Sequence, residues 1–127
     1  MFCPVCKQMM VVLELDKLEI DYCPSCGGIW LDSGELELLF EDLPRSRTFS
    51  ESFKIQKYTK EKIRRCPKCN KKMIKVLSSN KVLIDRCKND HGLWFDKDEL
   101  QTLVQFEYTQ DNSGVPDLLK KIFGQNK

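Results

Sequence analysis

The side chains of this 127-residue chain that are best suited to chemistry are its seven cysteines and its only histidine. They fall into four pairs: Cys3 with Cys6, Cys23 with Cys26, Cys66 with Cys69, and Cys87 with His91. Sixteen residues separate the first two pairs and seventeen separate the second two, which is close to the spacing of paired CxxC zinc sites. Eight ligands in two sets of four predict two tetrahedral zinc ions per chain.

The second and fourth pairs belong to a repeat. The stretch "CPSCGGIWLDSGEL" at 23–36 returns as "CKNDHGLWFDKDEL" at 87–100. Aligning the two tryptophans places Asp90 at the position of Cys26 and His91 one residue later. An imidazole reaches farther than a thiol and its Zn–N bond is shorter than Zn–S, so one extra residue is absorbed. We predict His91 as the fourth ligand, with Asp90 as the alternative.

Other uses of these cysteines fit less well. Seven is an odd number for a disulfide framework, and the start "MFCPVCKQMM" lacks the features of a signal peptide, so we expect a reducing cytoplasm. A redox CxxC usually stands alone beside a βαβ pattern, whereas here the pairs recur at metal spacing. Iron in a rubredoxin-like site fits the four-cysteine set as well, but the nitrogen ligand of the second set favours zinc.

Both predicted sites are filled by four protein ligands, which is typical of structural zinc and leaves no open position for a substrate. We therefore expect no enzymatic activity. A core of this size supplies only ~3–5 kcal/mol, whereas zinc binding supplies ~10–16 kcal/mol in small peptides. Metal should decide whether each half folds.

The elements between the ligands follow one plan in both halves. Alternating apolar residues predict a β-hairpin over 11–22 with a turn at Asp16 and Lys17, and a second one turning at 78–80. Asp32 with Glu35, and later Asp96 with Glu99, have the spacing of a helix capping box. The predicted fold is a small metal-stabilised α+β protein of two tandem zinc ribbons. Each ribbon is built as knuckle, hairpin, knuckle and helix, where a knuckle is the short turn that carries one pair of ligands.

We divide the chain into four segments. A first ribbon with its helix spans 1–43, a linker that becomes basic and could end in a short helix spans 44–63, a second ribbon spans 64–108, and a tail with an amphipathic helix spans 109–127. Trp30 and Trp94 are expected to pack each ribbon on its own helix, with ligand stacking as the alternative. The tail should dock on its own domain, or on another chain.

Charge is unevenly distributed although the net charge is only +2. Residues 1–43 hold two lysines and nine acidic residues, whereas residues 54–75 hold ten basic residues and one glutamate. A basic cluster of this kind can follow phosphates, although no aromatic interleaving accompanies it. The candidate nucleic-acid contacts are Lys54, Lys57, Lys60, Lys62, Arg64, Arg65, Lys68, Lys71, Lys72 and Lys75.

The segments "CPVC", "CPSCGGIWLDSGEL", "CPKC" and "GLWFDKDEL" resemble the bacterial transcription factor IIB-like zinc-finger family. The resemblance implies zinc ligation by the cysteines and departs from the family pattern at His91. We expect an adaptor that binds a protein partner, with transcription machinery as one candidate. The alternatives are a nucleic-acid-binding ribbon and a thiol redox or metal-handling protein. The sequence contains no run of about 18 apolar residues, so we expect no membrane span.

Overall fold

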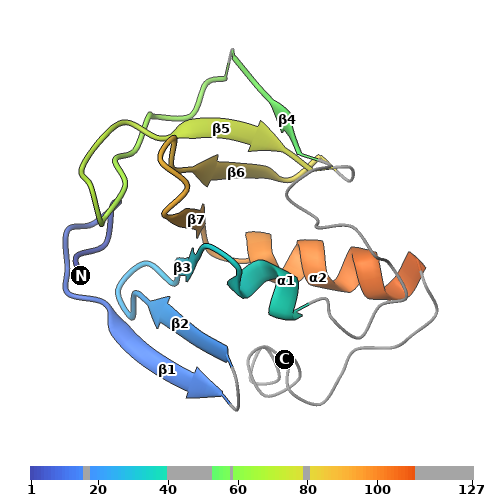
Figure 1. Cartoon of the computed structure of the whole chain (residues 1–127), viewed down its shortest axis with the longest axis horizontal. Coiled ribbons are helices and arrows are strands. Elements are labelled where there is room, and N and C mark those ends of the chain that lie inside the picture. Colours follow the sequence, from blue (N-terminus) through green and yellow to red (C-terminus); the bar gives the residue numbers. More distant parts are fainter. Residues whose placement is uncertain (16–17, 40–52, 58, 79–80, 111–127) are drawn as a thin grey trace.

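A computed structural model describes residues 1–15, 18–39, 53–57, 59–78 and 81–110 of the chain (Figure 1). Its described strands form one antiparallel sheet of seven, in the order β1-β2-β3-β7-β6-β5-β4. The strands are β1 (Val11–Leu15), β2 (Leu18–Tyr22), β3 (Ile29–Asp32), β4 (Lys54–Ile55), β5 (Ile74–Leu77), β6 (Leu83–Arg86) and β7 (Gly92–Phe95). The two helices are α1 (Glu35–Leu39) and α2 (Glu99–Gln110).

Two hairpins form the outer parts of this sheet, as the alternating sequence predicts. In the first, β1 pairs with β2 so that Val11 lies opposite Tyr22 and Leu13 lies opposite Ile20. In the second, β5 pairs with β6, and Val76 lies opposite Ile84. The predicted turn residues Asp16 and Lys17, like 79–80 of the second turn, lie outside the described residues.

Strands β3 and β7 join the two halves, and this connection was not predicted from the sequence. They pair antiparallel with Trp30 directly opposite Trp94. Because these tryptophans occupy equivalent positions of the repeat, their pairing places an approximate two-fold axis between them. Figure 1 shows the two hairpins on opposite sides of this central pair, so the halves share one continuous sheet.

The alternation of side chains along β3 and β7 separates two cores. Leu31 and Phe95 belong to a cluster that includes Leu36 of α1 and Leu103 of α2. The tryptophans, one position away, point to the opposite face of the sheet because successive strand residues alternate. There they form a second cluster with two buried methionines and the buried cysteines of the metal sites. The members of this cluster are Cys3, Met10, Cys23, Trp30, Cys66, Met73, Cys87 and Trp94. The expectation that each tryptophan packs on its own helix is therefore wrong.

Two glycines of the repeat make room for this tryptophan pair. A Cβ atom on Gly28 would lie 2.2 Å from Cζ2 of Trp94, and one on Gly92 would lie 2.7 Å from Cζ2 of Trp30. Each half therefore supplies a glycine on which the indole of the other half packs. The repeated Gly-x-Trp sequence is explained by this reciprocal contact.

The acidic residues after each tryptophan connect the strand to its helix. The indole N–H of Trp30 donates to Oδ1 of Asp32 at 2.9 Å, and the Asp32 backbone N–H donates to Oε1 of Glu35 at 2.9 Å. Equivalent bonds of 3.0 and 2.9 Å join Trp94 to Asp96 and Asp96 to Glu99. The glutamate arm of each capping box is present, while the aspartate side chain binds the indole instead of the helix.

The segment between the halves contains a short strand. Residues 54–55 form β4, and the described part of 53–63 contains no helix, so the helix considered for the end of the linker is not found there. Helix α2 continues to Gln110, and residues 111–127, which include the predicted tail helix, lie outside the described residues. Neither described helix is long and apolar enough to cross a membrane.

Substituting Gly28 tests the packing between the halves. We expect Gly28→Ala to lower the free energy of unfolding by ~1–3 kcal/mol because the methyl group would overlap the Trp94 indole. Urea unfolding at a fixed excess of zinc measures the effect. Trp94→Phe, which removes the overlapping ring, should offset part of the loss in the double variant. Strictly additive losses would contradict the proposed contact.

Candidate metal centres

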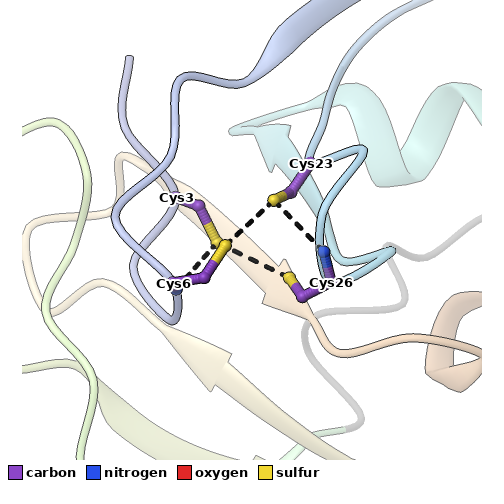
Figure 2. Close-up of side chains that lie close together, drawn as sticks. All are labelled: Cys3, Cys6, Cys23 and Cys26. Carbon is purple, nitrogen blue, oxygen red and sulfur yellow. Dashed lines mark hydrogen bonds between the residues drawn. The ribbon is translucent and has the colours of Figure 1, made fainter.

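The first two knuckles bring the four sulfurs of Cys3, Cys6, Cys23 and Cys26 together, in the same cluster as the two tryptophans. Figure 2 shows the four side chains facing one another across the gap between the two knuckles. The Sγ atoms of Cys3 and Cys26 are 3.6 Å apart, and those of Cys6 and Cys23 are 3.2 Å apart. In a tetrahedron with Zn–S bonds of about 2.3 Å, neighbouring sulfurs are separated by about 3.8 Å. The four thiols fit one zinc ion.

The second site combines three sulfurs with an imidazole. The Sγ atoms of Cys69 and Cys87 are 3.6 Å apart, and Nδ1 of His91 lies 3.4 Å from Sγ of Cys87 and 3.9 Å from Sγ of Cys66. All four ligand atoms lie within 4.8 Å of one another. The predicted grouping of ligands is thus the one that the fold brings together.

The fourth knuckle turns more tightly than the other three. In the second knuckle the Gly27 N–H bonds the carbonyl of Cys23, four residues back, whereas the Asp90 N–H bonds the carbonyl of Cys87, three residues back. Asp90 adopts φ 62°, a left-handed conformation that aspartate tolerates well. Its carboxylate is exposed and accepts a hydrogen bond from Ser33 at 3.5 Å. His91, one residue later, therefore joins the cluster of possible ligands, and Asp90 does not.

Backbone N–H groups prepare the sulfurs to carry negative charge. Val5 and Cys6 donate to Sγ of Cys3 at 3.3 and 3.4 Å, and Lys68 donates to Sγ of Cys66 at 3.3 Å. Burial nevertheless raises the pKa of Cys3 to about 12. The pKa of Cys6 falls to about 6, chiefly because the backbone N–H of Gln8 donates to it. A divalent cation among these sulfurs would favour the thiolate form of all four.

Closed coordination limits what the two centres can do. Each has four protein ligands, so a bound zinc ion has no free position for water or substrate. The first cysteine of every knuckle is buried, and the cysteine clusters pack on the shared tryptophans. Zinc at these positions would fix the knuckles against the central strands and thereby hold the sheet together.

The structure separates the basic side chains that pair with carboxylates of the protein from the other members of the predicted basic run. Lys75 is 4% exposed, and its Nζ lies 2.6 Å from Oδ1 of Asp85 and 3.0 Å from Oε1 of Glu61. Arg64 lies 2.8 Å from Asp96 and 3.5 Å from the same Asp85. Both basic side chains balance the buried carboxylate of Asp85.

Lys68 pairs with the other half of the molecule. Its Nζ lies 2.6 Å from Oδ1 of Asp32, so this ion pair crosses the joint between the halves. The remaining candidates are exposed side chains of the second half and the segment before it: Lys54, Lys57, Lys60, Lys62, Arg65, Lys71 and Lys72.

Glu99 offers a test of pH dependence. Burial, with smaller contributions from Asp96 and Glu61, raises its pKa to about 7. The folded protein then holds this proton more tightly than the unfolded chain, so the ionisation of Glu99 lowers stability as pH rises from about 4.5 to 7. We expect Glu99→Gln to gain ~1–3 kcal/mol relative to the parent between pH 5.5 and 8.

Thermal unfolding at both pH values in zinc-buffered solution measures this difference, because the metal sites are common to both proteins. Asp98→Asn removes an exposed neighbouring charge and serves as the control. Parallel pH profiles for Glu99→Gln and the parent would contradict the assignment.

The fourth ligand of the second site can be identified by metal content. We expect His91→Ala to retain one zinc ion per chain after a challenge with a competing chelator, because three ligands hold the second ion weakly. Asp90→Asn should retain two, since its carboxylate points to Ser33. Elemental analysis of both variants decides the matter, and loss of zinc from Asp90→Asn alone would reverse the assignment.

Comparisons with known proteins agree with this geometry. A family model described as "Transcription factor zinc-finger" matches residues 2–42 and again residues 65–105. No curated protein and no solved structure matches the chain. The two matched segments contain the two ligand sets and together cover more than half of the sequence. The chain therefore belongs to the transcription factor zinc-finger family, of which it carries two tandem copies with ligand sets suited to two zinc ions.

Proposed function

We propose that the protein is a non-catalytic adaptor whose two zinc ions are structural and whose task is to bind another protein. The observation that carries this proposal is an exposed apolar surface on the first half, which we call the apolar edge. It consists of Phe2, Val5, Met9, Val11, Val12 and Leu13.

These residues lie in the first knuckle, in the bridge that follows it and in strand β1. Phe2 and Met9 are both 58% exposed and face each other in a β-bridge, and Met9 leads through Met10 into β1. Strand β1 is an edge of the sheet, and its residues Val11 and Val12 are 44% and 54% exposed. Contiguous exposed apolar residues usually mark a site of interaction. The metal sites support the same role, since closed coordination leaves binding rather than catalysis.

Transcription machinery is the first class of partner to test, because the description of the matching family names a transcription factor. A nucleic-acid-binding role is the second candidate. Seven exposed basic side chains favour it, whereas Arg64, Lys68 and Lys75 are engaged with carboxylates of the protein itself. A redox role is the third, and it would require thiols that react readily while zinc is bound.

The adaptor role predicts that binding depends on the apolar edge. We expect the double variant Phe2→Asp with Met9→Asp to keep two zinc ions, because both side chains are exposed, and to lose partners that the parent retains. Affinity purification from the native cell after nuclease treatment, and direct binding to purified RNA polymerase, measure the loss. Ile63→Asp, which changes a residue 60% exposed just before the second ribbon, is the matched control.

The alternatives have their own signatures. Binding to random DNA or RNA that falls steeply with salt, and that weakens in Lys71→Glu with Lys72→Glu, would favour the nucleic-acid role. Fast thiol modification of the zinc-loaded protein would favour redox or metal-handling chemistry. Partners retained equally by the double variant and the control would overturn the adaptor proposal.

A further inference from the structure

The two edges of the sheet differ although the repeat makes them equivalent. The first knuckle and first strand of each half are related by 63 positions, so that Cys3 corresponds to Cys66 and Met10 to Met73. By this relation β1 corresponds to β5. Strand β5 is covered by β4, whereas no described residue pairs with the outer edge of β1.

Exposure of equivalent residues records this difference. Val76 of β5 is fully buried, at 0%, and packs in the same cluster as Phe53, which directly precedes β4. Its counterpart in β1 is Leu13, which is 41% exposed. Among the described residues, the same repeat position is therefore covered in one half and exposed in the other.

Strand β1 has few of the usual protections of an edge. It has five residues, whereas β4 has two, and its sequence "VVLEL" contains one charged residue, Glu14, and neither proline nor lysine. An edge strand also presents backbone N–H and C=O groups that have no partner in the sheet. Such a strand can accept an additional strand, a mode of binding in which backbone bonds give affinity and side chains give specificity.

The charges on this strand indicate what kind of strand would fit. Glu14 of β1 lies directly opposite Glu19 of β2, and the contact raises the pKa of Glu19. Like charges in this position destabilise a sheet, and a basic residue on the next strand would compensate them. Asp21, two residues farther along β2, adds to the negative charge of the same face.

The chain contains a strand of the required pattern. Within "FKIQK" at 53–57, Lys54 lies opposite Leu77 and Ile55 lies opposite Val76. The positions of β1 that correspond to Leu77 and Val76 are Glu14 and Leu13. Transferred to β1 in the same register, the β4 pattern would place a lysine beside Glu14 and an isoleucine beside Leu13.

We propose that β1 binds an extended segment of a partner protein with alternating basic and apolar residues, which pairs with its outer edge as β4 pairs with β5. This inference rests on the proposed adaptor function and names the partner chemistry of the apolar edge. The negative charge of Glu14, Glu19 and Asp21 favours such a segment over the β1 strand of a second copy, which would add a glutamate and no basic residue.

A synthetic peptide tests the pairing directly. The probe is the capped heptapeptide SFKIQKY, the sequence of residues 52–58, titrated into the zinc-loaded full chain labelled with 15N. We expect shift changes and slower hydrogen exchange at backbone amides of residues 11–15. Changing the peptide lysine that corresponds to Lys54 to glutamate should weaken binding about twofold to fivefold.

Exchanging the charges of Glu14 and of the peptide lysine distinguishes specific pairing from non-specific binding. Glu14→Lys changes an exposed side chain, so the protein should fold, and it should bind the glutamate peptide better than the lysine peptide. Absence of binding, shift changes away from β1, or equal affinities in all four combinations would overturn the proposal. Self-association of the parent through β1, detected by sedimentation, would overturn it in favour of a second copy.

The same reagents distinguish this inference from the adaptor function. If Phe2→Asp with Met9→Asp loses its partner while Glu14→Lys and excess peptide leave capture unchanged, edge pairing is wrong and the adaptor function stands. If the peptide binds with the expected charge dependence but no cellular partner depends on the apolar edge, the adaptor function is wrong and the pairing of β1 stands.

Discussion

The antiparallel pairing of β3 with β7 is the constraint on which the rest of the structure depends. It places Trp30 opposite Trp94, and each indole then packs on a glycine of the other half. Because those glycines follow metal-site knuckles, the position of one metal centre is tied to the side chains of the other half. The two ribbons behave as an intramolecular pair with a common core, and zinc binding to one half should support the folding of the other.

The exchange of a cysteine for His91 follows from the backbone of the fourth knuckle. That knuckle closes with a tighter turn at Asp90, which moves the next side chain one residue along. A thiol at the new position would have to reach as far as an imidazole does. The longer side chain of histidine restores the four-ligand set without lengthening the strand that follows, so β7 keeps its register with β3.

The sequence predicted the two clusters of possible ligands, the hairpins and the family, because each of these depends on local spacing or alternation. It did not predict the central strand pair. The segment "GIWL" is short and lies between a knuckle and a helix signal, and nothing local says that Trp30 faces away from its own helix. The repeat did contain one usable signal: a glycine two residues before each tryptophan is a position where another group can approach closely. Lys75 was counted among the candidate nucleic-acid contacts, but it lies directly opposite Asp85 in the β5–β6 hairpin, and their ion pair is buried.

Near-symmetry makes the remaining differences between the halves informative. The second half buries the Lys75–Asp85 pair and covers its outer strand with β4. The first half has Val12 opposite the corresponding Asp21, and its outer strand pairs only with β2 in the described part of the chain. A duplicated ribbon needs the ligands, the glycines and the tryptophans in both copies to keep the common core. It does not need identical edges. The outer strands can therefore differ while the common core is kept, and the proposed binding edge lies in the half whose outer strand has no second neighbour among the described residues.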